Sequence, residues 1–265
     1  MSRWRMRDFS PVRGKGRRNF IARLIAAASA LALAGCDKVS RSNWGPKILG
    51  VEEVVDRNTQ RALTSKTALA QEFPESDLSP TFRSNGTDNP EDEDYQRHVL
   101  TQFRDWRLRI DGLVGVPTTL SLAQLQAMKR RTQITRHDCV EGWSAIGKWT
   151  GVPLGEILNI VQPTSAARYV VFHCADPMDD SGTRYYESID LDDAHHPQTI
   201  LAYELNGQPL PVANGAPVRI RVERQLGYKM AKYIMRIELV DSFKRVGGGN
   251  GGYWEDQGYE WYAGI

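Results

Sequence analysis

The segment Thr135–Trp149 reads TRHDCVEGWSAIGKW and carries one cysteine, Cys139, in a charged, tryptophan-rich setting. The residues just before it, Thr132–Arg136, are predicted to form a β-strand, so the cysteine directly follows a strand. The residues alone leave several roles open for Cys139. It can be an ordinary buried thiol, half of a disulfide, a nucleophile, a zinc ligand, or a ligand to a metal that a cofactor holds.

The other cysteine and the histidines of the chain help to distinguish between these roles of Cys139. An exported compartment permits a disulfide between Cys139 and Cys174, although the first lies in a charged turn and the second ends an apolar strand. No local cysteine-protease signature surrounds Cys139. The adjacent His195 and His196 suit a single zinc ion poorly. We favour a soft thiolate ligand to a high-valent metal whose other ligands come from a cofactor.

The start of the chain has the layout of an export signal. Residues 1–23 are basic, residues 24–34 form a short apolar stretch, and LAGC follows at Leu33–Cys36. The apolar stretch is too short to span a bilayer. We therefore expect a signal peptide over residues 1–35.

Three details of this segment indicate where the protein is exported. Arg17 and Arg18 resemble the paired arginines of the twin-arginine export motif, and LAGC resembles a bacterial lipobox whose cysteine is lipidated. Asp37 resembles the signal for retention at the inner membrane. We expect export by the twin-arginine machinery, which carries folded proteins that often hold a cofactor, and a periplasmic protein with a lipid anchor at Cys36.

The charge distribution argues against a nucleic-acid partner. The 265 residues include 34 Lys and Arg and 32 Asp and Glu, for a formal net charge of +2. The basic excess is concentrated in residues 1–23, and the remainder of the chain is acidic. An acidic body repels a phosphate backbone, so nucleic acid is not an expected partner.

Composition divides the mature chain into parts. Residues 36–80 are polar and are predicted to form a tether with one short helix over Val51–Leu63. Ser79–Tyr95 is rich in Pro, Asn, Asp and Gly and is predicted to be a loop, and its acidic run Glu91–Asp94 is interpreted as solvated surface. Residues 81–245 then form the main domain.

Predicted strands outnumber predicted helices in the main domain. Alternation and β-propensity predict strands over Trp106–Ile110, Thr132–Arg136, Tyr169–His173, Thr199–Leu205, Val218–Val222 and Tyr233–Val240. A capping box predicts a helix from Ser121, and a short helix is expected over Leu154–Val161. The sequence therefore predicts a single, mixed, strand-rich α+β domain.

The last twenty residues, 246–265, combine glycines with aromatic residues. Such a segment is loosened by glycine and has large rings available for packing. We expect it to lie against the domain through its aromatic side chains, which are Tyr253, Trp254, Tyr259, Trp261 and Tyr262.

Five ordered segments resemble the sulfite oxidase superfamily of molybdopterin oxidoreductases. They are CVEGW from Cys139, GVPL from Gly151, NGAPVRIRV from Asn214, GYK from Gly227 and IMRIELV from Ile234. The resemblance covers about residues 79–240 and is closest to the bacterial periplasmic methionine sulfoxide reductase branch. It implies the strand-rich molybdopterin-binding fold of that superfamily.

The resemblance also assigns residues. It implies that Cys139 is the catalytic residue and the molybdenum ligand. It implies that further residues hold the pterin and its phosphate, namely Asn214, Arg219, Gly227, Tyr228 and Lys229. Alternation in VRIRV alone would instead place Arg219 on an exposed strand face.

Three positions depart from the branch. Arg83 and Ser84 occupy pterin-contacting places with different chemistry, and Cys174 stands where the branch has a cofactor-contacting threonine. Cys174 is open to two interpretations, a cofactor contact or a buried thiol beside the site. Arg136, His137 and Lys148 flank Cys139 and are candidates for a pocket that attracts anionic substrates.

By this resemblance the protein is an exported oxidoreductase with one molybdenum-molybdopterin per chain. It carries out two-electron oxygen-atom transfer on sulfoxides or similar S- or N-oxides, borne by small molecules or proteins. The alternatives are a sulfite dehydrogenase and a non-catalytic lipoprotein that serves as a binding module.

The sequence also sets expectations for redox partners. There is no C-x-x-C-H motif and no second cysteine cluster, so neither haem nor an iron-sulfur cluster is expected. Electrons must then be exchanged with another protein, and the resemblance implies a membrane cytochrome b or a soluble cytochrome c. The chain is expected to be monomeric.

Overall fold

The computed structural model describes residue 65 and residues 67–265. The expected signal peptide, the lipidation site Cys36 and the tether helix over Val51–Leu63 lie outside the described residues. Within the described part, none of the helices has both the length and the apolarity needed to cross a membrane.

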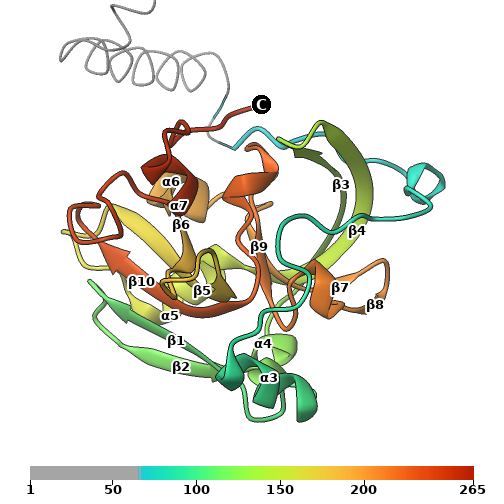
Figure 1. The fold of residues 1–265 in the computed structure, drawn as a ribbon. Helices are drawn as coiled ribbons and strands as arrows, with labels where there is room; N and C mark the ends of the chain where they lie inside the picture. Colours follow the sequence, from blue (N-terminus) through green and yellow to red (C-terminus); the bar gives the residue numbers. More distant parts are fainter. Residues whose placement is uncertain (1–64, 66) are drawn as a thin grey trace, which may run out of the picture. The chain divides into compact units, whose positions relative to one another are not determined.

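The first of two five-stranded sheets has the strand order β2-β1-β10-β5-β6 (Figure 1). Its strands are β2 (Thr118–Ser121), β1 (Arg107–Gly112), β10 (Ile234–Val240), β5 (Tyr169–Pro177) and β6 (Arg184–Asp190). β1 and β10 run parallel, and the other neighbours are antiparallel, so the sheet is mixed. In β1, Leu108 and Ile110 are buried while Arg107 and Arg109 are exposed, which is the alternation of a strand with one buried face.

The second sheet holds Cys139. Its strands are β3 (Arg131–Cys139), β4 (Trp143–Pro153), β7 (Ile200–Leu205), β8 (Gln208–Pro209) and β9 (Arg219–Arg221), with β9 paired to β7. β3 and β4 form a hairpin in which Cys139 pairs with Trp143. Gly142 adopts φ +83 in the turn, a conformation that glycine accepts readily, and its N–H donates to the Cys139 carbonyl at 3.0 Å. Cys139 is thereby fixed at a hairpin tip.

Short helices fill the connections. They are η1 (Glu75–Asp77), α3 (Glu93–Leu100), α4 (Leu122–Ala127), α5 (Leu154–Val161), α6 (Leu191–Ala194), η2 (Val212–Asn214), η3 (Gly227–Lys229) and α7 (Tyr253–Asp256). The main apolar core joins both sheets, because it packs Ile110 and Phe172 of the first sheet with Leu201 and Ile220 of the second. One core shared by both sheets makes this a single α+β domain, as predicted.

Most predicted elements of the domain are confirmed. Each predicted strand overlaps an observed one, α5 has the predicted bounds, and the capping box of Ser121 and Gln124 begins α4. The strands β2, β4, β6 and β8 were not predicted. The prediction of loop through Tyr95 was wrong, because α3 begins at Glu93.

The acidic run Glu91–Asp94 explains that error. The Asp92 side chain accepts a hydrogen bond from the Tyr95 N–H at 2.9 Å and caps α3, and Glu93 and Asp94 lie in its first turn. Carboxylates at a helix N-terminus are stabilised by the exposed N–H groups there. Part of the run therefore has a structural role beyond solvation.

Candidate functional site

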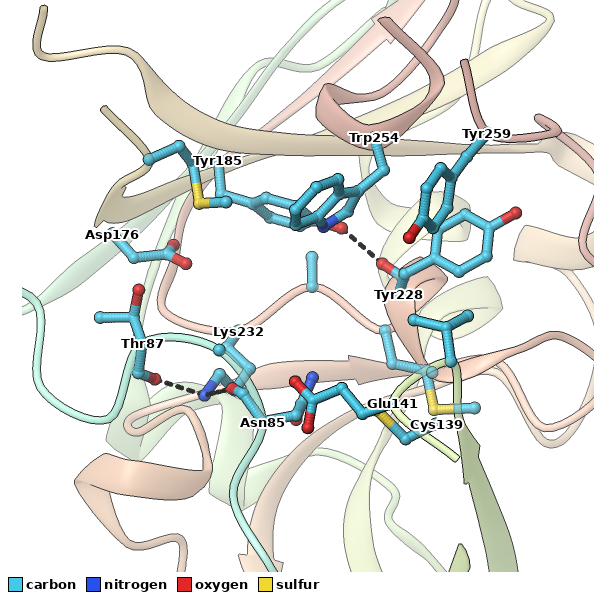
Figure 2. Close-up of a pocket in the computed structure, with 16 residues that line it drawn as sticks. Asn85, Thr87, Cys139, Glu141, Asp176, Tyr185, Tyr228, Lys232, Trp254 and Tyr259 are labelled. Atoms are coloured by element: carbon cyan, nitrogen blue, oxygen red, sulfur yellow. Dashed lines mark hydrogen bonds between the residues drawn. The ribbon is translucent and has the colours of Figure 1, made fainter. Parts of the chain in front are cut away.

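Cys139 borders a cavity of about 210 Å³. The cavity is lined by Asn85, Gly86, Thr87, Cys139, Val140, Glu141, Asp176, Met178, Tyr185, Gly227, Tyr228, Met230, Ala231, Lys232, Trp254 and Tyr259. Figure 2 shows Cys139, Glu141, Asn85 and Lys232 on one side of it and aromatic rings on the other. Six separate segments of the chain therefore build one site.

The Cys139 thiol is available as a ligand. Both Cys139 and Cys174 are free, which excludes the disulfide between them. Burial raises the pKa of the Cys139 thiol, and the nearby Glu141 charge adds to this, while Arg219 and Arg83 oppose it. A thiol of this kind becomes a thiolate when a bound metal stabilises the anion. In the described residues no group of three His, Cys, Asp or Glu is arranged to hold a metal, so a metal at Cys139 needs ligands from a cofactor.

Gly227 and Tyr228 also line the cavity. A Cβ atom on Gly227 would lie 2.5 Å from ring atoms of His137, so only glycine allows η3 to approach β3 this closely. Tyr228 donates through its hydroxyl to the Glu260 carbonyl at 2.5 Å. The GYK segment is thus held against both the cysteine strand and the C-terminal tail.

Arg219 lies behind the cavity wall and is completely buried, not exposed as alternation alone suggests. Its guanidinium donates to the carbonyls of Asn214 at 3.1 Å and Met230 at 3.0 Å, and Nε has no partner. It also lies 5.3 Å from the centre of the Trp149 ring. Burial, followed by the charge of Arg221, lowers its pKa to about 9. None of the described carboxylates forms an ion pair with Arg219, so no anionic side chain in this part of the chain neutralises its guanidinium group.

Asn214 shares this arrangement. It is 7% exposed, ends η2, and its side-chain Nδ2 has no hydrogen-bond partner in the described part of the chain. A buried amide donor without a partner costs roughly 1–3 kcal/mol. Asn214 and Arg219 thus both present unused N–H groups inside the protein.

Lys229 is not brought to the cavity. It is fully buried and its ammonium group forms ion pairs with Glu187 and Glu255. These two carboxylates hold the pKa of Lys229 above its ordinary value although burial alone lowers it. The side chain of Lys229 therefore joins β6 to α7.

Lys232 lines the cavity, although it was not predicted from the sequence. Its Nζ donates to the carbonyls of Asn85 at 2.6 Å, Thr87 at 2.5 Å and Ala213 at 3.1 Å. Burial, followed by the charge of Arg219, lowers its pKa to about 8. The sequence GYKMAK offers two lysines three residues apart, and only the second lines the cavity.

The positions that differ from the methionine sulfoxide reductase branch, Arg83, Ser84 and Cys174, lie near the cavity but do not line it. Arg83 lies 5.6 Å from the centre of the Trp143 ring, while the residues after Ser84, Asn85–Thr87, form the wall itself. Cys174 is 2% exposed and belongs to the apolar core, which matches a buried thiol beside the site.

Asp176 was also missed. It lines the cavity, is 5% exposed, and its Oδ1 has no hydrogen-bond partner among the described residues. Burial raises the pKa of this carboxyl to about 7, although Lys232 opposes the rise. The sequence signal was its place two residues after Cys174 at the end of an apolar strand.

The three residues flanking Cys139 do not converge on an anion pocket. Arg136 pairs with Asp138 at 2.9 Å, and Lys148 pairs with Glu75. His137 is fully buried and lies 2.9 Å from the guanidinium of Arg221. Burial and this charge hold the pKa of His137 well below its ordinary value, so it is neutral. None of the three lines the cavity.

Comparison with known proteins gives a consistent family. The family model described as oxidoreductase molybdopterin binding domain matches residues 96–245. The chain is 37% identical to an Azospira oryzae protein provisionally named protein-methionine-sulfoxide reductase subunit YedZ1, over 94% of this chain and 87% of that protein. It is 35% identical to the protein-methionine-sulfoxide reductase catalytic subunit MsrP of Xanthomonas campestris pv. campestris, over 84% of this chain and 70% of that protein.

Among solved structures, the chain is similar to the sulfane dehydrogenase SoxCD from Paracoccus pantotrophus. The sequence identity is 22% and the TM-score 0.46, over 52% of this chain and 39% of that chain.

Proposed function

Because the chain belongs to the oxidoreductase molybdopterin-binding domain family, we propose that it is a molybdenum enzyme that reduces sulfoxides, with methionine sulfoxide as the substrate class. The single observation that carries the assignment of the site is the cavity that brings the Cys139 thiol together with the buried ammonium group of Lys232, whose hydrogen-bond partners are all backbone carbonyls. The printed names of the relatives supply the substrate class.

The residues present fit molybdopterin. Cys139 would bind the metal, since soft sulfur suits a metal that changes oxidation state. Arg219 and Asn214 would hold the anionic, phosphate-bearing part of the cofactor, because each has a buried N–H group without an acceptor. Lys232, whose three N–H groups already donate to backbone carbonyls, would add a positive charge at the cavity wall. When bound, the cofactor supplies the exchange of an oxygen atom and two electrons with the substrate.

The overall reaction consumes protons as well as electrons. A sulfoxide, two electrons and two protons yield a thioether and water. Glu141 places a carboxyl group in the cavity, where Trp143 Nε1 donates to it at 3.0 Å. Asp176, with its pKa near 7, holds a proton on its buried carboxyl at neutral pH and below. The chain thus offers two carboxyl groups at the cavity, of which Asp176 is buried and Glu141 is exposed.

The assignment of Cys139 is tested with holoenzyme made alongside cofactor synthesis. We expect wild type to contain about one molybdenum per chain, to show a Mo(V) electron paramagnetic resonance signal, and to reduce methionine sulfoxide with reduced viologen dye. Cys139→Ser is expected to lose the signal and the activity, whereas Cys174→Ala, the matched buried thiol, keeps both. An unchanged Mo(V) spectrum in Cys139→Ser contradicts the assignment.

The alternatives give different results in the same preparation. A sulfite dehydrogenase reduces cytochrome c when supplied with sulfite, and a binding module contains no molybdenum. We expect no turnover of sulfite, because Arg136 and Lys148 pair with carboxylates and do not line the cavity. We expect molybdenum to be present, because the chain belongs to the molybdopterin-binding family.

Location and redox partner rest on the sequence and are part of the proposal. The twin-arginine-like pair at Arg17 and Arg18 and the lipobox-like LAGC support a periplasmic protein anchored through Cys36. Electrons come from a membrane cytochrome b or a soluble cytochrome c. Labelling with a radioactive fatty acid is expected to mark wild type and not Cys36→Ala. Equal labelling of both forms contradicts the anchor.

A further inference from the structure

The C-terminal tail contributes to the cavity although it lies outside the region that matches the family. That match ends at residue 245, yet Trp254 and Tyr259 line the same cavity as Cys139. Aromatic packing explains the position of the tail as a whole but not why these two rings face the cavity. They therefore call for a role beyond attachment.

The tail is held firmly enough to form part of a binding site. Glu255 pairs with the buried Lys229, and Asp256 accepts hydrogen bonds from the Tyr186 hydroxyl and from the N–H of Asn250 at 3.0 Å. Further along, the Leu226 N–H donates to the Ala263 carbonyl at 2.9 Å. These bonds fix α7 and the following residues on β6 and on η3, which carries Tyr228.

Three rings form a continuous surface that we call the aromatic wall: Tyr228, Trp254 and Tyr259. The Trp254 and Tyr259 rings lie 5.4 Å apart at 30°, and the Tyr228 and Tyr259 rings lie 5.3 Å apart at 89°. Tyr259 remains 43% exposed, in contrast to Trp261 of the same tail at 9%. The tail therefore buries one ring and leaves another open beside the cavity.

The two sides of the cavity differ in chemistry. Figure 2 shows Trp254 and Tyr259 across the cavity from Lys232, Glu141 and Cys139. The polar side offers a thiol and a cation, which suit a metal and an anion. The aromatic wall offers rings, which make favourable contacts with the sulfur of a methionine side chain. A molecule that has a polar oxygen and apolar S-substituents matches both sides.

Given the proposed sulfoxide reduction, we propose that Trp254 and Tyr259 determine specificity by binding the apolar substituents on the sulfur of the substrate. The oxygen of the sulfoxide then points toward the polar side that holds Cys139. The wall favours a methionine sulfoxide side chain and disfavours a compact, fully charged oxyanion such as sulfite, which has no apolar group to cover the rings.

The test uses molybdenum-loaded holoenzyme and a peptide that contains methionine sulfoxide. In Trp254→Ala and Tyr259→Ala we expect KM for the peptide to rise roughly tenfold, the scale of one or two such ring contacts, with kcat within about twofold. Trp254→Phe is expected to recover most of the loss. Tyr262→Ala, an aromatic position of the same tail outside the cavity wall, serves as the matched control and is expected to keep wild-type KM.

A second readout does not depend on turnover. Calorimetry with the same peptide carrying methionine sulfone, which lacks the reducible sulfoxide, is expected to show binding weakened to the same degree in Trp254→Ala. Molybdenum content and the Mo(V) spectrum are expected to match wild type. Trp254→Leu preserves an apolar side chain for the case in which the alanine variant fails to fold.

Three results overturn the proposal. Loss of molybdenum from soluble, folded Trp254→Leu means that the wall holds the cofactor. An unchanged KM in both alanine variants means that the wall does not touch the substrate. A fall in kcat alone, with sulfone binding intact, means that the wall acts on a later step. Failure of wild type to reduce any sulfoxide refutes the proposed function itself, which is a separate outcome.

Discussion

The ammonium group of Lys232 donates to the backbone carbonyl of Asn85 at 2.6 Å and so ties the segment before β10 to the loop that precedes α3. Two further carbonyls, of Thr87 and Ala213, complete its surroundings. Carbonyl oxygens carry only partial negative charge and do not neutralise the ammonium group. Lys232 is therefore placed to accept an anion that enters the cavity.

From this we predict that Lys232→Met lowers the cofactor content of the protein. Removing the charge takes away an electrostatic partner of a phosphate-bearing cofactor, and at least a tenfold loss in retention corresponds to about 1.4 kcal/mol. Molybdenum per chain after extensive dialysis measures the effect. Lys148→Met, which removes an ammonium group outside the cavity, is the control. Equal retention in both variants would show that Lys232 does not hold the cofactor.

Lys229 has a different expected phenotype. Lys229→Met leaves Glu187 and Glu255 buried without their cation, which typically costs about 3–5 kcal/mol. We predict a large fall in the free energy of unfolding, measured by urea titration. Replacing Glu187 by Gln in the same chain is expected to recover part of it, because one buried negative charge is then removed. If Lys229→Met is instead as stable as wild type but binds less cofactor, Lys229 binds the phosphate of the cofactor and the prediction is wrong.

Asp176 predicts a pH dependence of stability in the cofactor-free protein. Its folded pKa of about 7 lies above its ordinary value of 3.8, so between these values the folded state binds the proton and the unfolded state does not. Stability contributed by this group is present below pH 4 and is lost as the pH rises toward 7. Asp176→Asn is expected to remove this part of the dependence and to be more stable than wild type at pH 8. Parallel stability curves for the two proteins from pH 4 to 8 would refute it.

The close approach at Gly227 yields a fourth prediction. A Cβ atom there meets the buried His137 ring at 2.5 Å, so Gly227→Ala must displace η3 or β3. We predict a loss of about 1–3 kcal/mol in stability, the usual cost of overpacking, together with lower molybdenum content. Gly155→Ala, whose nearest neighbour would lie at 3.4 Å, is the tolerated control. Similar melting temperatures for the two variants would contradict the steric argument.

Local sequence signals predicted most of the helices and strands. They failed for segments whose conformation is determined by tertiary contacts. The alternation in β1 and the capping box of α4 are visible in a few adjacent residues. The strand β4 cannot be recognised from adjacent residues, because it contains Gly147 and Gly151 and is defined by its pairing with β3. The loop prediction through Tyr95 overlooked that Asp92 can cap a helix, since its neighbours are typical of loops.

The candidate site shows the same division. The motif around Cys139 is local, and the structure places that cysteine beside the cavity. The choice between Lys229 and Lys232 is not local, because Glu187 and Glu255 reach Lys229 from distant segments. Arg219 follows the alternation of an exposed strand face but is buried, because Trp149 of β4 and the Met230 carbonyl cover its guanidinium.

The position of Trp254 and Tyr259 in chain order has a consequence for truncated forms of the protein. Both residues follow the last strand of either sheet, so the final segment of the chain completes the cavity. A chain cut before Trp254 would keep Cys139 and Lys232 but would lack the two rings that lie across the cavity from them.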